Sequence, residues 1–104
     1  MDRPELSDAR FNAPIAFVDV ETTGGHPAWH RVTDVAIVAM RGGEVEWEWH
    51  SLVNPGVSIP PSIQSLTGIS NQMVASAPSF ADLADEVLRR LEGRLFVAHN
   101  VRCD

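Results

Sequence analysis

FVDVETTG, residues 17–24, is a short apolar run that two acidic residues interrupt. Runs of this kind, rich in β-branched residues, are typical of a buried strand. Because side chains alternate faces along a strand, Asp19 and Glu21 point the same way, with their Cα atoms about 6.6 Å apart. Burying two carboxylates on one face costs several kcal/mol per ion unless a partner compensates, and a divalent cation does so through oxygen ligands. The pattern therefore indicates a metal site; the alternative is two acids that face water at a frayed strand end.

Length and composition limit the class of protein. The chain has 104 residues, of which 44% are hydrophobic and 21% charged, as expected for one small globular domain. Its net charge of −6 argues against a general polyanion-binding surface, but it permits a site that meets phosphate through bound metal. A single cysteine, Cys103, gives no disulfide framework, and no apolar run is long enough to span a bilayer. We therefore expect a cytoplasmic protein without a membrane partner, with residues 1–13 as a flexible tail.

The spacing of apolar residues predicts four strands, at residues 15–21, 31–41, 44–53 and 95–99. The second strand is apolar on both faces, which favours a central position, and Gly42-Gly43 predicts a hairpin turn after it. The fourth strand follows the third through helices, so we expect it to pair in parallel with the first.

Alternation along residues 44–53 predicts a core face and a solvated face. Val45, Trp47 and Trp49 are expected in the core, where packing is favoured over stacking on a base. The solvated face is expected to carry Glu44, Glu46, Glu48 and His50.

Capping signals predict three helices between the third and fourth strands. Short helices are expected at residues 62–66 and 70–75, each with a serine as its N-terminal cap. Capping-box spacing at Ser79 and Asp82 begins a longer amphipathic helix that reaches Leu91.

The fourth strand adds polar residues to the first. If the two strands are parallel, His99 and Asn100 emerge at the same sheet edge as Glu21, and Asp104 faces Asp19 and Glu21 from one helical turn beyond. Three carboxylates in a small volume need cations, and two-metal phosphoryl-transfer sites use such acids. The alternative for His99 is a hydrogen-bonded core histidine.

Two motifs resemble those of a known family. FVDVETTG is similar to the first motif of the DEDD 3′→5′ exonucleases, and VAHNVRCD, residues 97–104, is similar to their second. Four segments between them resemble the proofreading branch, the epsilon subunit of bacterial DNA polymerase III: NPG at 54–56, IP at 59–60, LTGI at 66–69 and APSF at 77–80. Thr67-Gly68 in this set has a plain alternative, which is to end a short helix.

The resemblance implies a ribonuclease-H-like α/β fold, a mixed sheet with flanking helices, of which residues 14–104 form the N-terminal part. It implies two Mg²⁺ or Mn²⁺ ions held by the catalytic carboxylates of Asp19, Glu21 and Asp104. Asp19 and Glu21 would ligate the first ion, Asp19 would also touch the second, and Asp104 would hold the second largely through water.

The resemblance also implies a substrate site for the 3′ end of a nucleic acid, foremost single-stranded DNA, and a DNA polymerase subunit as partner. The implied substrate-binding residues are Thr22, Thr23, Gly24, Leu66, His99 and Asn100. Among them, the backbone at Thr22 and Thr23 would lie near the terminal 3′-hydroxyl, while Leu66 and His99 would flank the terminal base and sugar.

The sequence departs from the family in two places. Cys103 stands where the family usually has Phe, and the third motif, with its histidine general base and fourth aspartate, is absent. We therefore expect this chain itself to be inactive, with one sheet face uncovered around Val35 and Ile37. The alternatives are a catalytically silent module for binding or assembly and an RNA-trimming exoribonuclease of the same fold.

Overall fold

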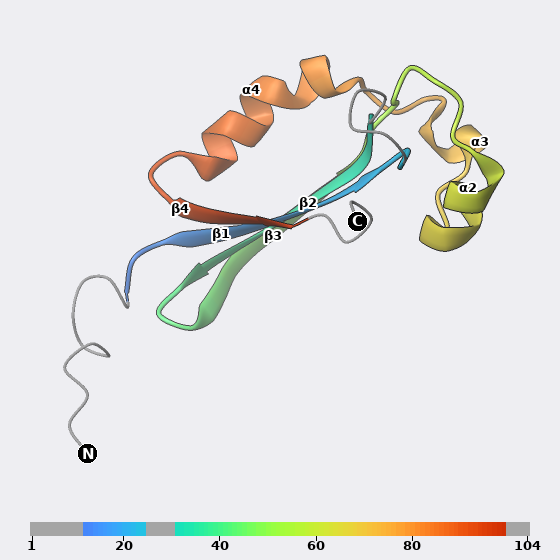
Figure 1. Cartoon of the computed structure of the whole chain (residues 1–104). Helices are drawn as coiled ribbons and strands as arrows, with labels where there is room; N and C mark the ends of the chain where they lie inside the picture. The colour runs from blue at the N-terminus through green and yellow to red at the C-terminus, as the bar shows by residue number, and fades with distance from the viewer. Residues whose placement is uncertain (1–11, 25–30, 100–104) are drawn as a thin grey trace.

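The computed structural model describes residues 12–24 and 31–99, and their fold is a four-stranded mixed sheet in the order β3-β2-β1-β4 (Figure 1). Strands β1 (Ile15–Thr22), β2 (Val32–Arg41) and β3 (Glu44–Leu52) pair in antiparallel fashion, and β4 (Leu95–His99) pairs in parallel with β1. The predicted strands, the interior position of β2 and the parallel pairing of β4 are confirmed. The tail expected at residues 1–13 lies almost entirely outside the described residues.

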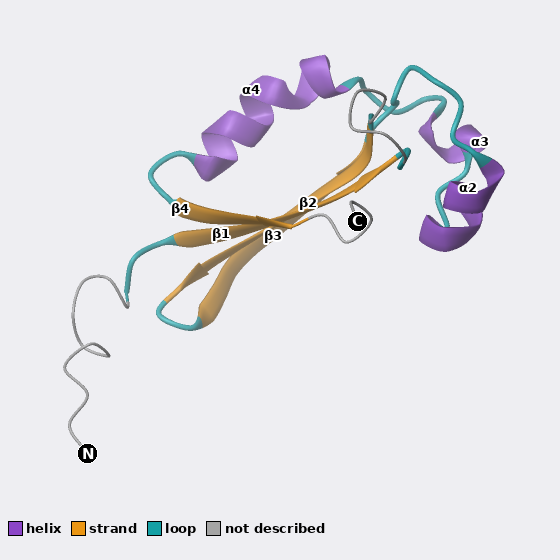
Figure 2. Ribbon diagram, viewed as in Figure 1, coloured by secondary structure: helices purple, strands orange, loops and turns teal. Residues whose placement is uncertain are grey.

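Helix α4 (Phe80–Leu91) lies along one face of the sheet, and the capping box predicted at its start is confirmed (Figure 2). The Asp82 amide donates to Ser79 Oγ at 3.1 Å, and the Ser79 amide donates to Asp82 Oδ2 at 3.3 Å. These two bonds satisfy donors that the first helical turn leaves without an intrahelical partner.

Two short helices, α2 (Pro61–Thr67) and α3 (Asn71–Val74), lie beyond the end of the sheet where β1 ends (Figure 2). Ser70 caps α3 as predicted. The prediction that Ser62 caps α2 is wrong: the cap position is Pro60, and no side chain bonds there. Pro61 occupies the first helical position instead, where its fixed φ suits the helix and its missing N–H costs nothing.

A β-bulge in β3 decides which way its side chains face. Met40 pairs with Val45, whereas the next residue of β2, Ala39, pairs with Trp47. Glu46 is therefore an extra residue, and each extra residue in a ladder shifts the register of everything beyond it by one. Val45 lies on the opposite face from Trp47 and is 53% exposed, so the prediction that Val45 shares the tryptophan face is wrong.

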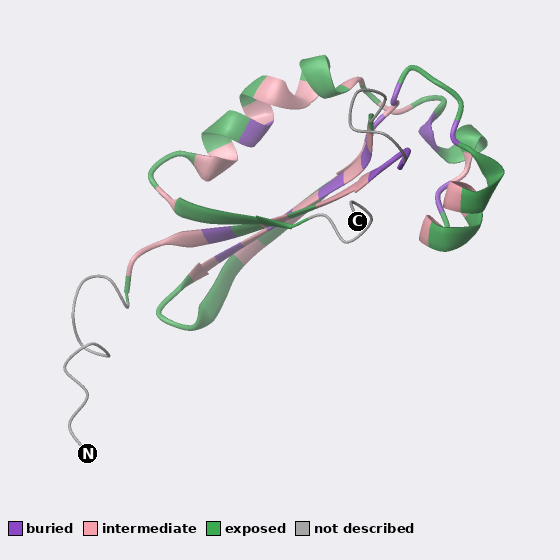
Figure 3. Cartoon of the chain, in the orientation of Figure 1, coloured by how far each residue is buried: buried purple, intermediate pink, exposed green. Residues whose placement is uncertain are grey.

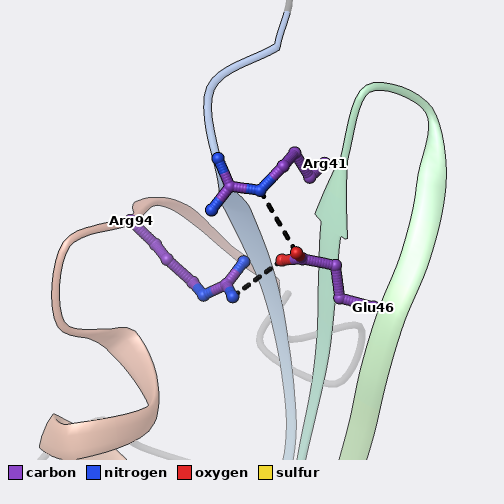
Figure 4. A network of polar contacts seen from close by, with 3 residues as sticks. All are labelled: Arg41, Glu46 and Arg94. Atoms are coloured by element: carbon purple, nitrogen blue, oxygen red, sulfur yellow. Dashed lines mark hydrogen bonds and ion pairs between the residues drawn. The ribbon is translucent and has the colours of Figure 1, made fainter.

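The same bulge also changes the side to which Glu46 points. The prediction that Glu46 lies on the solvated face with its acidic neighbours is therefore wrong. Glu46 Oε2 accepts from Arg41 Nε at 3.1 Å, and Glu46 Oε1 accepts from Arg94 Nη2 at 2.8 Å (Figure 4). The Arg94 guanidinium also lies over the Trp47 ring, with 5.3 Å from its central carbon to the ring centroid. Glu46 therefore faces the tryptophan side and ties β3 to the segment after α4.

Two apolar clusters hold the described residues together. The first joins α4 to the sheet, with Ala16, Ile37 and Val87 buried and Val18, Trp47, Trp49, Leu83 and Leu91 packed against them. The second holds α2 and α3, with Ile59, Ile69 and Val74 buried and Leu52 and Ile63 packed against them. The Arg90 guanidinium lies 5.2 Å from the Trp47 ring centroid and 4.9 Å from that of Trp49. The prediction that these tryptophans pack in the core is confirmed.

The sheet has one covered and one open face, but the open face is not the one expected. Val35 and Ile37 are 1% and 0% exposed, because alternation places them on the side of α4. The exposed apolar residues of the other face include Phe17 at 42% and Val97 at 53%. Strand β4 is exposed along its length (Figure 3). Within the described ranges, no helix is long and apolar enough to cross a membrane.

Candidate functional site

Asp19 and Glu21 project from the same face of β1, as the strand period requires. Asp19 pairs with Ala36 of β2, and Glu21 pairs with Asp34. This is the open face, opposite the buried Ala16. Asp19 is exposed and Glu21 is half-buried, so the desolvation cost of Asp19 is lower than expected for a carboxylate on a buried strand. Asp19 is therefore accessible to a ligand from solvent, whereas Glu21 Oε1 is buried.

His99 lies beside Asp19, because the two are register partners in the parallel ladder between β1 and β4. Paired residues of adjacent strands point to the same face, so His99 shares the open face with both acids. Asn100 and Asp104, which were expected to complete this edge, lie outside the described residues.

A third acid and a second histidine lie next to this pair, although the sequence pattern did not predict that they would. Asp34 is the partner of Glu21 across the β1–β2 ladder, and its Oδ1 contacts His50 Nε2. His50 pairs with Ala36, which places it on the same open face. Counting back from the hairpin turn would have paired Asp34 with Ser51, because the bulge at Glu46 is not visible in the pattern of apolar residues. The sequence therefore held no signal that Asp34 and His50 lie beside the two acids of β1.

The donor set suits a cation that prefers oxygen ligands, since both expected ligands on β1 are carboxylates. In the part of the chain that the structure describes, no three Asp, Glu, His or Cys side chains are grouped so that they could hold a metal ion. Of the three ligands expected from the sequence, Asp19 and Glu21 therefore lie within the described residues, and Asp104 lies outside them.

The turn after β1 is buried and tightly bonded. Thr22, Thr23 and Gly24 are buried, and the Gly24 amide donates to Thr22 Oγ1 at 3.2 Å. The Thr23 amide donates to the Arg31 carbonyl at 2.8 Å, and the Arg31 amide donates to Thr23 Oγ1 at 3.2 Å. These bonds fix the backbone immediately after the two acids.

Gly24 also connects this turn to α2. Its φ is +76°, and a Cβ placed on it would lie 2.7 Å from Ile63 Cδ1. Only glycine therefore lets the turn approach α2 this closely. Leu66, three residues after Ile63, is 55% exposed, so it is not a core residue.

Thr67 and Gly68 end α2, which was the plain alternative for this segment. Thr67 Oγ1 donates to the Ile63 carbonyl at 2.9 Å and accepts from the Ile69 amide at 3.1 Å. Gly68 has a φ of +78° at the C-terminal cap, and its amide donates to the Gln64 carbonyl at 2.8 Å. The two residues thus have a structural role that is independent of any ligand.

Comparison with known sequences identifies relatives of this chain. The exonuclease family RNase_T matches residues 16–104. The 3′-5′ exonuclease DinG of Bacillus subtilis (strain 168) is 42% identical over 88 residues, which are 84% of this chain and 10% of that protein. The chain therefore spans about a tenth of the length of the DinG relatives that it matches.

Comparison with solved structures gives the fold class. The nuclease domain of 3′hExo, a DEDDh family member bound to rAMP, superposes with a TM-score of 0.73 at 21% identity, over 90% of this chain and 54% of that one. Exonuclease X in complex with 5′ overhanging duplex DNA gives a TM-score of 0.67 at 27% identity, over 82% of this chain and 48% of that one. The ribonuclease-H-like mixed sheet expected from the sequence is confirmed, and this chain corresponds to about half of each of those chains.

Proposed function

The chain belongs to the exonuclease family RNase_T, and from that premise we propose that residues 14–104 are the N-terminal part of a metal-dependent 3′→5′ exonuclease domain. The observation that carries this proposal is the open face of β1, where Asp19 and Glu21 project together and His99 of β4 lies beside Asp19. The words "3′-5′ exonuclease" in the names of the DinG relatives support the direction of hydrolysis.

In this proposal Asp19 and Glu21 hold the first of two Mg²⁺ or Mn²⁺ ions, and Asp19 and Asp104 hold the second. When bound, such ions stabilise the negative charge that develops on a transferring phosphate. The exposure of Asp19 supports its role, because the carboxylate is open to both the ions and the substrate.

The substrate residues that we propose surround the two acids. The backbone of Thr22 and Thr23 lies near the terminal 3′-hydroxyl, and Gly24 completes the turn that they begin. Leu66 of α2 and His99 of β4 flank the terminal base and sugar, and Asn100 follows His99. The exposure of Leu66 supports this assignment, since a wall for a bound base must be free of core contacts.

The proposed substrate is the 3′ end of a single strand, with DNA favoured. We further propose a proofreading role in the cytoplasm, together with a DNA polymerase subunit. The segments of the sequence that resemble the epsilon subunit support this proposal. An RNA substrate is the second candidate, and the specific observation in its favour is the fold shared with a nuclease domain bound to rAMP.

We also propose that the 104-residue polypeptide, tested alone, binds nucleotide but does not hydrolyse it. Neither His50 nor His99, the two histidines within the described ranges, occupies the helical third motif that supplies the family's general base. Without a general base, the rate of such a reaction falls by typically 10²–10⁴-fold.

Calorimetric titration with Mn²⁺ tests the metal site. We expect binding heat for the chain, loss of that heat in Asp19→Ala, and full retention in Asp85→Ala, which removes an exposed acid of α4. Equal Mn²⁺ binding by the wild-type chain and by Asp19→Ala would contradict a metal site on β1.

Release of mononucleotides from end-labelled single-stranded DNA and RNA tests the reaction. We expect no release by the 104-residue chain and metal-dependent release by an extended polypeptide that carries the third motif. Release by the extended polypeptide that survives Asp19→Ala would contradict the proposed catalytic role. Release by the short chain that Asp19→Ala abolishes would contradict its inactivity alone.

A further inference from the structure

Arg31 is held directly beside the turn that follows the two acids. Its main chain makes both of the bonds to Thr23 described above, one through its carbonyl and one through its amide. Thr23 is only two residues from Glu21, so the backbone of Arg31 is fixed next to the candidate active site. Its side chain takes no part in these two bonds.

Arg31 differs from every other arginine of the described ranges in having no carboxylate partner. Arg41 and Arg94 both pair with Glu46. The remaining two, Arg89 and Arg90, both pair with Glu86. The Arg31 guanidinium reaches only the carbonyl oxygen of Pro55, at 3.5 Å from Nη1, which is the outer limit of a hydrogen bond.

The Arg31 side chain borders a cavity of about 240 Å³ at the start of α4. Its lining is Arg31, Val32, Asn54, Pro55, Gly56, Ser79, Phe80 and Ala81, which includes no acidic residue. The Asn54 side chain is already engaged, because its Oδ1 accepts from the Gly56 amide and its Nδ2 donates to the Ala75 carbonyl. Among the described residues that line this cavity, Arg31 is therefore the charged one.

The size of the cavity limits what it accepts. Pockets that enclose a whole small molecule measure about 300–1,000 Å³, so 240 Å³ suits a phosphate and part of a sugar rather than a complete nucleotide. A guanidinium offers a planar fork of donors that matches two phosphate oxygens. A phosphodiester group is thus the ligand that fits the charge and the volume together.

We propose that Arg31 binds a backbone phosphate of the nucleic-acid strand whose 3′ end lies at Asp19 and Glu21. This inference rests on the proposed function and adds a substrate contact to it. A chain of net charge −6 repels a polyanion, and the acids of the open face repel it most. Arg31 has no carboxylate partner, and its backbone is fixed next to the turn that follows the acids, so its charge offsets part of that repulsion.

The test is the salt dependence of binding to a fluorescein-labelled oligo(dT), measured by anisotropy with Mn²⁺ between about 50 and 200 mM salt. Arg31→Gln is expected to weaken binding about tenfold at the lowest salt and to reduce the slope of log K against log salt by about 0.7, the value for one phosphate of a single strand. Arg31→Lys is expected to keep most of the slope, because it keeps the charge. The main-chain bonds to Thr23 remain in both variants, so a thermal melt should show an unchanged fold.

Arg89→Gln is the matched control, since it removes an exposed arginine of α4 that is paired with Glu86. An Arg31→Gln variant that keeps the affinity and slope of the wild type overturns this inference and leaves the proposed function intact. The same holds if Arg89→Gln reduces both quantities equally. A wild-type chain that fails to bind the oligonucleotide overturns the inference and the proposed function together.

Discussion

Gly24, in the turn after β1, packs so closely on Ile63 of α2 that a Cβ at Gly24 would lie 2.7 Å from Ile63 Cδ1. This contact joins the strand that carries both acids to the helix that carries Leu66. The two parts belong to different apolar clusters, so the glycine is a point of contact between them. The position of α2 relative to the end of β1 therefore depends on residue 24 having no Cβ.

Gly24→Ala is expected to lower the free energy of unfolding by about 1–3 kcal/mol, because it combines a positive φ with a steric clash. Gly68→Ala is the matched control, since Gly68 has a φ of +78° and nothing within 4 Å of its would-be Cβ. Urea denaturation should show the larger loss for Gly24→Ala. Adding Ile63→Val, which removes the clashing Cδ1, should recover part of the difference. Equal losses for the two glycines would mean that α2 adapts without cost.

Leu66→Ala should change the free energy of unfolding by no more than about 0.5 kcal/mol, as is usual for an exposed side chain. It should weaken binding of a nucleoside monophosphate measured by calorimetry with Mn²⁺, because the proposed wall of the base is lost. Leu88→Ala removes a leucine of α4 that is also exposed, 66% against 55% for Leu66, and should leave the affinity unchanged. A loss of about 2–5 kcal/mol in the Leu66→Ala melt, with affinity intact, would instead make Leu66 a core residue.

Asp34→Asn should weaken Mn²⁺ binding severalfold without abolishing it. Asp34 lies across the ladder from Glu21, so its charge attracts a cation that the two acids of β1 hold. A unit charge about 8 Å from a divalent ion contributes about 1 kcal/mol in bulk water, which is about fivefold in affinity. Glu48→Gln, on the open face of β3, is the control for net charge and should have a smaller effect. Complete loss of binding would instead make Asp34 a ligand.

Glu46→Gln should destabilise the chain at neutral pH and lose its effect in acid. Hydrogen bonds from Arg94 and then Arg41 hold the pKa of Glu46 below its usual value of 4.5. A carboxyl whose pKa is lowered by folding stabilises the fold above its unfolded pKa, and this contribution disappears as the pH falls through the folded value. The difference in unfolding free energy between wild type and variant should therefore be full at pH values well above 4.5 and shrink below it.

Glu48→Gln serves as the control for Glu46→Gln, because Glu48 is an exposed neighbour on the same strand. Its difference from the wild type should show a weaker dependence on pH. Urea midpoints measured at several pH values compare the three proteins directly. A Glu46→Gln difference that stays constant from neutral to acid pH would show that the two arginines do not hold the charged form.

The sequence alone determined the elements of this fold and the position of the acids on β1. Strands follow from runs of apolar and β-branched residues, and the start of α4 follows from the capping box at Ser79 and Asp82, all of which are local patterns. The common face of Asp19 and Glu21 follows from the period of two along a strand, which needs no knowledge of the rest of the chain. The parallel pairing of β4 followed from the helices that precede it.

The tertiary structure decided which side chains of neighbouring strands share a face of the sheet. Without the extra residue at Glu46, Ala36 would pair with Trp49, and the tryptophans would share a face with Asp19 and Glu21. The bulge instead turns them toward α4, brings Glu46 to Arg94, and sets His50 against Asp34. The contact of Gly24 with Ile63 is likewise invisible in the sequence. Local patterns fix the direction of each side chain relative to its own strand, but the register between strands is a long-range quantity, and a shift of one residue exchanges the two faces.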